Sequence, residues 1–246
     1  MYATGNASAE SLANLIAEDK YDEAVQNIDQ YPESYLHELI ARARGQSLWN
    51  DAVWNKLMHY KKNPWGGYTS QVDGADFFNS GDGKNNPQAE MEATLARFFS
   101  TRDVAPTTLP PHCRFIARYQ WLKGKLGFDP SRMPDGECAP FNELRDALKP
   151  EAISIIFPSA HPNSPSSMFG HTFIRIDRKG QVRETRMLDF TINYAAQVDS
   201  GNTLAYAVKG LTGGFEGRFN VLPYHLKLRE YVQMENRDLW EYKLSL

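Results

Sequence analysis

Apolar side chains in the N-terminal part of the chain recur at intervals of three and four positions, the spacing of one buried stripe on a helix. Asn86 and Pro87 form a typical helix start, with the Asn as N-cap and the Pro at the first helical position. Turn residues dominate positions 61–86, which are expected to form one long ordered loop. The pattern predicts helical structure over residues 8–28, broken near Asp19 to Asp22, and helices over residues 33–49, 51–60, 86–99 and 113–126.

The periodicity changes to that of strands after residue 150. Residues 153–157 form a short continuous apolar run, typical of a buried strand. Residues 172–177 alternate, with Ile174 and Ile176 on one face and Arg175 on the other. Further strands are expected at residues 182–194, 203–208 and 238–246.

Strands at short intervals with turns between them indicate an antiparallel sheet packed on helices, so the sequence predicts an α+β fold. A proline-rich stretch, residues 105–111, is the expected boundary between a helical N-terminal region (1–105) and an α+β domain (106–246). The last alternating pattern continues to Leu246 without a closing polar segment, which favours a truncated C-terminus.

Composition then narrows the function classes. The 246 residues include 41% hydrophobic and 23% charged side chains and carry a net charge of −3, so no basic surface points to nucleic acid. No apolar run approaches the length of a membrane span. The N-terminus does not read as an export signal, but it is compatible with a mature terminus. Residues 210–217 are glycine-rich without P-loop or Rossmann spacing, and no cofactor or metal site is predicted.

Cys113 and Cys138 are the two cysteines of the chain. Neither belongs to a CxxC pair, which argues against a zinc site. A disulfide between them would stabilise the fold by roughly 3 kcal/mol in an oxidising compartment. Two reduced thiols in a core are the alternative, and composition leaves both open.

The least generic segment lies between the strands predicted at residues 153–157 and 172–177. A serine-rich loop begins at Ser159, and His171 opens the second strand. A histidine within hydrogen-bond reach of a serine can take the hydroxyl proton and so activate the oxygen as a nucleophile. A histidine that only forms hydrogen bonds within its loop is the alternative interpretation.

Several segments resemble the Lnb N-terminal periplasmic domain family of bacterial envelope proteins, most specifically Pro-x-Ser-Met-Phe-Gly-His at residues 165–171. The resemblance implies a periplasmic or envelope location and a papain-like, NlpC-like domain with an antiparallel sheet. Residues 57–60, 76–78 and 86–90 are similar to the helical region that precedes this domain in many members. The resembling segments of the domain itself are residues 159–177, 193–196, 206–214 and 235–242.

Family members with an assigned activity are lipoprotein N-acyltransferases, which move an acyl chain from a phospholipid to the N-terminal amine of a lipoprotein through a Cys–His site. The resemblance therefore implies a phospholipid and a lipoprotein as partners, next to the envelope membrane. It implies His171 as general base. Asn193, Asp189 and Asp177 are candidates for the residue that orients the imidazole, and Asn193 is favoured because it lies in a resembling segment. The family cysteine falls at Ser159, twelve residues before His171 (171 − 159 = 12).

Cys113 is the other candidate nucleophile, because it opens a helix and a helix N-terminus lowers the pKa of a thiol. An envelope location instead favours a disulfide with Cys138. Two other functions fit the same segments: a non-catalytic module that binds lipid or a partner, and a cell-wall peptidase or amidase.

Overall fold

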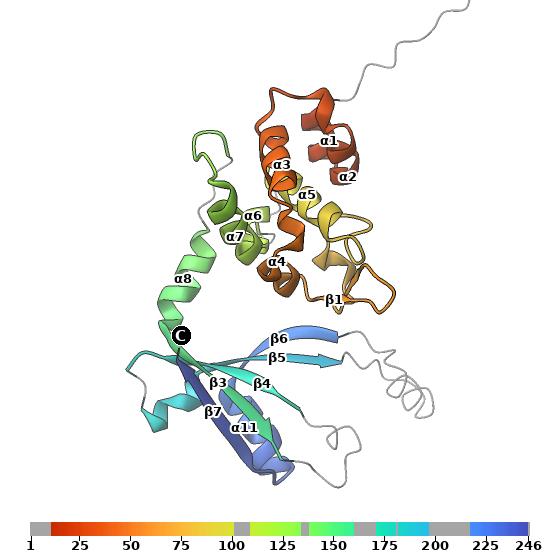
Figure 1. The fold of residues 1–246 in the computed structure, drawn as a ribbon. Helices are drawn as coiled ribbons and strands as arrows, with labels where there is room; N and C mark the ends of the chain where they lie inside the picture. The colour runs from red at the N-terminus through yellow and green to blue at the C-terminus, as the bar shows by residue number, and fades with distance from the viewer. Residues whose placement is uncertain are drawn as a thin grey trace, which may run out of the picture. The chain divides into compact units, whose positions relative to one another are not determined.

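The computed structural model describes residues 11–100, 109–133, 138–159, 171–180, 182–196 and 217–245, and the chain forms two compact units (Figure 1). The N-terminal unit ends at Cys138 and the C-terminal unit begins at Ala139. The predicted boundary at residues 105–106 falls outside the described residues. The helices after it contribute Tyr119 and Leu122 to the N-terminal core. Helices together with antiparallel sheets confirm the α+β prediction.

The N-terminal unit is mainly helical, as the apolar stripes predict. The helix start at Asn86 is confirmed, because its side chain accepts a hydrogen bond from the Ala89 N–H. The break predicted near Asp19 to Asp22 is confirmed, because the first helix ends at Ala17, the second begins at Tyr21, and Asp19 between them has a φ of 61°. The helices are α1 (Leu12–Ala17), α2 (Tyr21–Gln26), η1 (Ile28–Gln30), α3 (Tyr35–Gly45), η2 (Leu48–Asn50), α4 (Ala52–Leu57), η3 (Ala75–Phe77), α5 (Pro87–Arg97), α6 (Pro111–Arg114) and α7 (Ile116–Leu126).

The predicted loop over residues 61–86 contains a hairpin of β1 (Tyr60–Lys62) and β2 (Tyr68–Ser70). Gly66 and Gly67 have φ values of 97° and 77°, which allow the tight connection between the two strands. The rest of the loop is fixed by Glu90 of α5, whose buried carboxylate accepts hydrogen bonds from the N–H groups of residues 79 and 80. A regular hairpin therefore replaces part of the predicted loop.

The C-terminal unit holds a five-stranded antiparallel sheet in the order β6-β5-β4-β3-β7 (Figure 1), as predicted. Residues 183–188, predicted to begin a strand, form a 3-10 helix instead, and the strand predicted at 203–208 lies outside the described residues. The elements are α8 (Ala139–Leu148), β3 (Pro150–Pro158), β4 (Phe173–Arg178), η4 (Arg183–Leu188), β5 (Phe190–Ala196), β6 (Gly217–Pro223), α11 (Tyr224–Leu228), the π-helix η5 (Arg229–Met234) and β7 (Leu239–Ser245).

The two faces of this sheet differ. One face packs on α11 and η5, where Ile156 and Phe173 form a buried cluster with Tyr224 and Tyr231. The opposite face is apolar, and many of its side chains are exposed among the described residues. They include Phe157, Tyr194, Phe219, Val221, Trp240, Tyr242 and Leu244.

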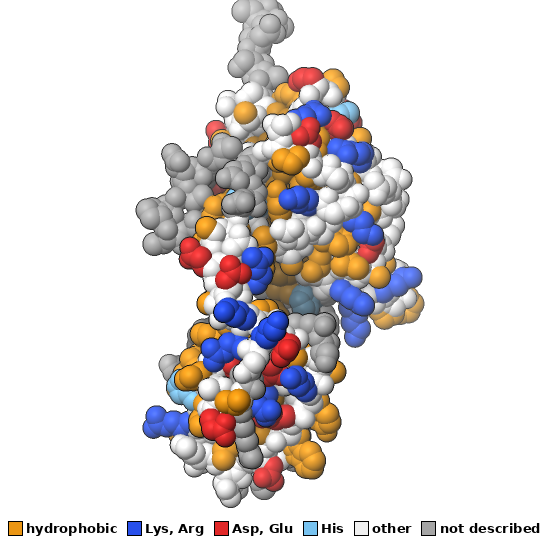
Figure 2. Space-filling view, turned by 90° about the vertical axis from the view of Figure 1, so that its left-hand side faces the viewer, with side chains coloured by type: hydrophobic (Ala, Val, Ile, Leu, Met, Phe, Trp, Pro, Cys, Tyr) orange, Lys and Arg blue, Asp and Glu red, His pale blue; other side chains and the backbone are white. Residues whose placement is uncertain are grey.

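Charged side chains of both signs are interspersed on the face of the C-terminal unit that Figure 2 shows. Arg145 and Asp146 of α8 form an exposed ion pair in this unit. No helix in the described part of the chain is long and apolar enough to cross a bilayer.

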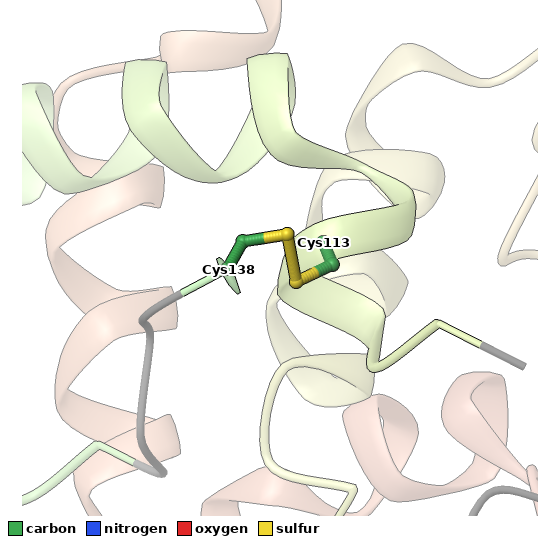
Figure 3. Close-up of a disulfide and its surroundings, with 2 residues drawn as sticks. All are labelled: Cys113 and Cys138. Atoms are coloured by element: carbon green, nitrogen blue, oxygen red, sulfur yellow. A yellow bond between two sulfur atoms is a disulfide. The ribbon is translucent and has the colours of Figure 1, made fainter. Parts of the chain in front are cut away.

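Cys113 of α6 and Cys138 form a disulfide, with 5.3 Å between their Cα atoms (Figure 3). The disulfide interpretation is thereby confirmed. The bond ties the segment that follows α7 back to α6, within the N-terminal unit.

Replacing both cysteines by serine is expected to lower the free energy of unfolding of the N-terminal unit by about 3 kcal/mol, because the loop between them is then open in the unfolded chain. Urea unfolding of the wild type and the double variant, each with and without reductant, measures this. Reductant should destabilise the wild type and leave the variant unchanged. Equal stability of the oxidised and reduced wild type would show that the disulfide does not stabilise the unit.

Candidate active site

His171 lies just before β4, and its ring contacts the neighbouring strand β5. Nε2 of His171 is 2.6 Å from Oδ1 of Asn193. Asn193 is fixed because it is buried and lies opposite Phe173 in the β4–β5 register. Since Oδ1 can only accept, Nε2 carries the proton and Nδ1 keeps its lone pair. The structure thus brings together two of the residues that the sequence singled out.

Aromatic rings surround the half-buried imidazole of His171. The centroids of Phe173 and Tyr231 lie 6.3 and 6.1 Å from that of His171, and the two aromatic rings stack on each other at 5.8 Å. Tyr231 belongs to η5, so the helical layer below the sheet forms one wall of the site. The packing restricts how far the imidazole can turn.

The pKa of His171 is lowered from its ordinary value, chiefly because burial penalises the charged imidazolium. The hydrogen bond that His171 donates to Asn193 opposes this shift, and the positive charges of Lys227 and Arg237 add to it. The nearby carboxylate of Glu230 acts in the opposite direction to the two cations. The lowered pKa favours the uncharged ring, which is the form that can accept a proton.

Ser159 directly follows β3, at the end of the sheet where β3 ends and β4 begins. Ile156 pairs with Phe173 in the last pair of the β3–β4 register, so Ser159 and His171 both lie beyond the same end of the two paired strands. The Ser159 Oγ accepts a hydrogen bond from the Asp238 N–H at 3.0 Å. That bond uses a lone pair of the oxygen and leaves the hydroxyl proton available to another acceptor. No hydrogen bond joins Ser159 and His171 in the structure.

Arg237 is a buried residue of the site that sequence reasoning did not single out. Its Nε donates to the carbonyl of Ser159, and its Nη2 donates to the carbonyl of Pro158 at 3.3 Å. The guanidinium also lies 4.9 Å from the ring centroid of Tyr231. Arg237 therefore links the end of β3 to the wall beside His171. The signal in the sequence that could have pointed to Arg237 is its position within residues 235–242, one of the segments that resemble the family.

The alternative partners of His171 have other contacts. Asp177 accepts hydrogen bonds from Arg175 and Ser154, at 2.7 and 2.6 Å. Asp189 accepts one from Arg178 at 2.9 Å. Both carboxylates are thereby engaged in ion pairs on the sheet rather than beside the imidazole.

Cys113, the other candidate nucleophile, is bonded to Cys138 and has no thiol in this state. Within the described ranges, no group of three or more His, Cys, Asp or Glu side chains is arranged to hold a metal ion.

Two family models match different parts of the chain. Residues 140–246 match the Lnb N-terminal periplasmic domain, and this range contains Ser159, His171 and Asn193. Residues 46–125 match a domain of unknown function (DUF7843). No curated protein and no solved structure matches the chain at a significant level. Over residues 140–246, the match confirms the resemblance to the Lnb N-terminal periplasmic domain family.

Proposed function

We propose that the C-terminal unit catalyses acyl transfer in the bacterial envelope, with Ser159 as nucleophile, His171 as general base and Asn193 as the residue that orients the imidazole. The observation that carries the proposal is the 2.6 Å hydrogen bond between His171 Nε2 and Asn193 Oδ1. The same His–Asn pairing orients the base in papain-like enzymes, which use Cys, His and Asn. The lowered pKa of His171 supports the role, since a base must be neutral to act.

In the proposed reaction the Ser159 Oγ attacks the carbonyl carbon of an ester while its proton passes to Nδ1 of His171. The ester C–O bond then breaks, and the leaving alcohol takes the proton from His171. This leaves an acyl group on Ser159. An amine then attacks the acyl carbonyl carbon and passes a proton to His171. The bond from that carbon to Ser159 Oγ breaks, Oγ takes the proton back from His171, and the product is an amide.

The proposed acyl donor is a phospholipid, and the proposed acceptor is the N-terminal amine of a lipoprotein. Both come from the resemblance to envelope acyltransferases, and the periplasmic family match supports the compartment. A peptidase or amidase would use the same three residues with a peptide in place of the ester. Comparing turnover of phospholipid esters and cell-wall peptides distinguishes these substrates.

The test is covalent labelling with a fluorophosphonate, followed by mapping of the adduct. We expect an adduct on Ser159 in the wild type and none there in Ser159→Ala. A matched variant, Ser159→Cys, restores the thiol of the family pattern and should react with iodoacetamide at the same position. Absence of both adducts in folded protein would overturn the assignment of the nucleophile.

A non-catalytic binding module is the second candidate. It is favoured by the Ser159 hydroxyl, which accepts from the Asp238 N–H and has no hydrogen bond with His171 in the structure. Under this alternative the Ser159 hydroxyl only forms a structural hydrogen bond at the end of β3, and Ser159→Ala would leave ligand binding unchanged. The labelling experiment separates the two candidates.

Substitutions of Asn193 should move the pH dependence of Ser159 labelling in opposite directions. The labelling rate falls as the pH falls through the pKa of the base, because protonated His171 cannot accept a proton. The Asn193 hydrogen bond raises that pKa, so Asn193→Ala should shift the acidic limb to lower pH and reduce the plateau. Asn193→Asp places a carboxylate beside the ring and should shift the limb up by about 1–3 pH units. Identical profiles for both variants would contradict the pairing.

A further inference from the structure

The hairpin of the N-terminal unit presents an unusual tip. β1 and β2 pair from Tyr60 with Ser70 to Lys62 with Tyr68, and residues 63–67 connect them. Trp65, in this connection, is 99% exposed. A tryptophan in water contributes nothing to the core of its own unit. Tryptophan side chains are enriched at protein–protein interfaces and at the interface between membrane and water.

The tip is held rigidly rather than being a loose loop. The Asn63 N–H donates to the Gly67 carbonyl at 3.0 Å, and the Asn63 side chain donates to Thr69 at 3.1 Å. At the base of the hairpin the Ser70 N–H donates to the Lys84 carbonyl at 2.8 Å. The Tyr60 hydroxyl donates to the carbonyl of Gly83. Trp65 is thus projected into solvent by a braced element, so little flexibility is lost when it binds.

The charge of the hairpin is opposite in sign to that of the chain. Residues 60–70 contain two lysines and no acidic residue, whereas the chain has a net charge of −3. Lys61 and Lys62 are both exposed, on the strand that leads to the tip. Lysines near an anionic lipid surface each strengthen binding, and tryptophan sits at the level of the lipid headgroups.

We propose that this hairpin docks the N-terminal unit on an anionic lipid surface, with Trp65 at the headgroup level and the positive charges of Lys61 and Lys62, on the two faces of the strand behind the tip, attracted to the lipid charges. Three observations favour a lipid surface as the partner: the fully exposed tryptophan, the bracing of the strands and the local positive charge. A single tryptophan and two lysines make a weak, reversible contact. The docking does not depend on the chemistry proposed for the C-terminal unit.

Co-sedimentation of the full chain with vesicles of phosphatidylcholine containing phosphatidylglycerol tests the proposal, with pure phosphatidylcholine vesicles for comparison. We expect binding to the anionic vesicles that weakens with salt. Trp65→Ser should reduce it at least about tenfold, by the loss of interfacial apolar contact. Lys61→Gln/Lys62→Gln should reduce it about fivefold for each charge removed. The control Lys123→Gln/Lys179→Gln removes the same charge from two other exposed lysines and should bind as the wild type does.

Brominated lipids identify the contact, since they quench only tryptophans at the membrane. Quenching is expected in the wild type and should be lost in Trp65→Phe, which retains an aromatic anchor and should still sediment with the vesicles. Three results would overturn the proposal: no sedimentation of the wild type, unchanged sedimentation of Trp65→Ser, or undiminished quenching in Trp65→Phe. The first would favour a protein as the partner of the tip, and the last would place another tryptophan at the membrane.

Discussion

Replacing His171 by alanine is expected to slow covalent modification of Ser159 by a fluorophosphonate about 10²–10⁴-fold, because the hydroxyl then has no base to take its proton. The neutral imidazole, oriented through Nε2 by Asn193, supplies the lone pair on Nδ1. The rate of fluorophosphonate labelling at saturating probe measures the effect. The thermal unfolding temperature is measured on the same samples, so that loss of the base is separated from loss of the fold.

His225 provides the matched control for that substitution. It belongs to the same unit and is exposed on α11, with one hydrogen-bonding contact to the carbonyl of Met187 at 3.3 Å. His225→Ala should label at the wild-type rate. Equal rates for wild type and His171→Ala would remove His171 from the mechanism, even if Ser159 is labelled.

The second large effect is expected from Arg175, a buried residue on the helix-covered face of the sheet. Arg175 donates to Asp177 at 2.7 Å and to Glu241 at 2.9 Å. Arg175→Ala leaves the buried carboxylate of Asp177 without its counter-charge, which costs about 3–5 kcal/mol. Urea unfolding of the C-terminal unit, followed by circular dichroism, should show a loss of this size.

Arg145→Ala is the control, because Arg145 is 53% exposed and pairs with an exposed Asp146. An exposed ion pair contributes about 0–1 kcal/mol, so the free energy of unfolding of this variant should be close to that of the wild type. Equal stability losses for both arginines would contradict the role given to the buried network.

The same network has a pH dependence of known sign. Burial alone raises the pKa of Glu241, but the hydrogen bonds from Arg175 and Tyr224 outweigh it and the pKa is lowered. A carboxyl with a lowered pKa contributes stability above its unfolded-state pKa and loses it as the pH falls through the folded-state pKa. The stability difference between wild type and Arg175→Ala should therefore narrow on acidification.

Local patterns predicted the parts of the fold that depend on local interactions. The apolar stripe of α3 is buried throughout, and Asn86 caps α5 as its sequence indicates. The hairpin was missed because turn residues outnumber strand residues in positions 61–86. Its short strands are stabilised by contacts with Gly83 and Lys84, which a local pattern does not contain.

The alternation of β4 was predicted, but hydrophobicity alone would have assigned its inner face incorrectly. Ile174 and Ile176 lie on the open face and are only half-buried, whereas Arg175 and Asp177 are buried on the face covered by helices. Ion pairs and hydrogen bonds offset the cost of burying those charges. Glu241, the partner of Arg175, lies 66 positions away in sequence, so no local pattern signals the network.

The candidate site also contains residues that the sequence indicated and one that only the folded structure revealed. The family resemblance pointed to both His171 and Asn193, and the structure places them in contact. Arg237 holds the carbonyl of Ser159 from 78 positions away, through the pairing of β3 with β7. That pairing depends on the folded sheet, which explains why Arg237 was identified only in the structure.

Nitrogen NMR of selectively labelled histidine tests the role of His171 most directly, because it reports which ring nitrogen carries the proton. At neutral pH the expected state of His171 is neutral, with the proton on Nε2 and the lone pair on Nδ1. Its titration midpoint should lie below the ordinary histidine value and should fall further in Asn193→Ala. A ring that is charged at neutral pH, or protonated on Nδ1 alone, would contradict its assignment as the base that activates Ser159.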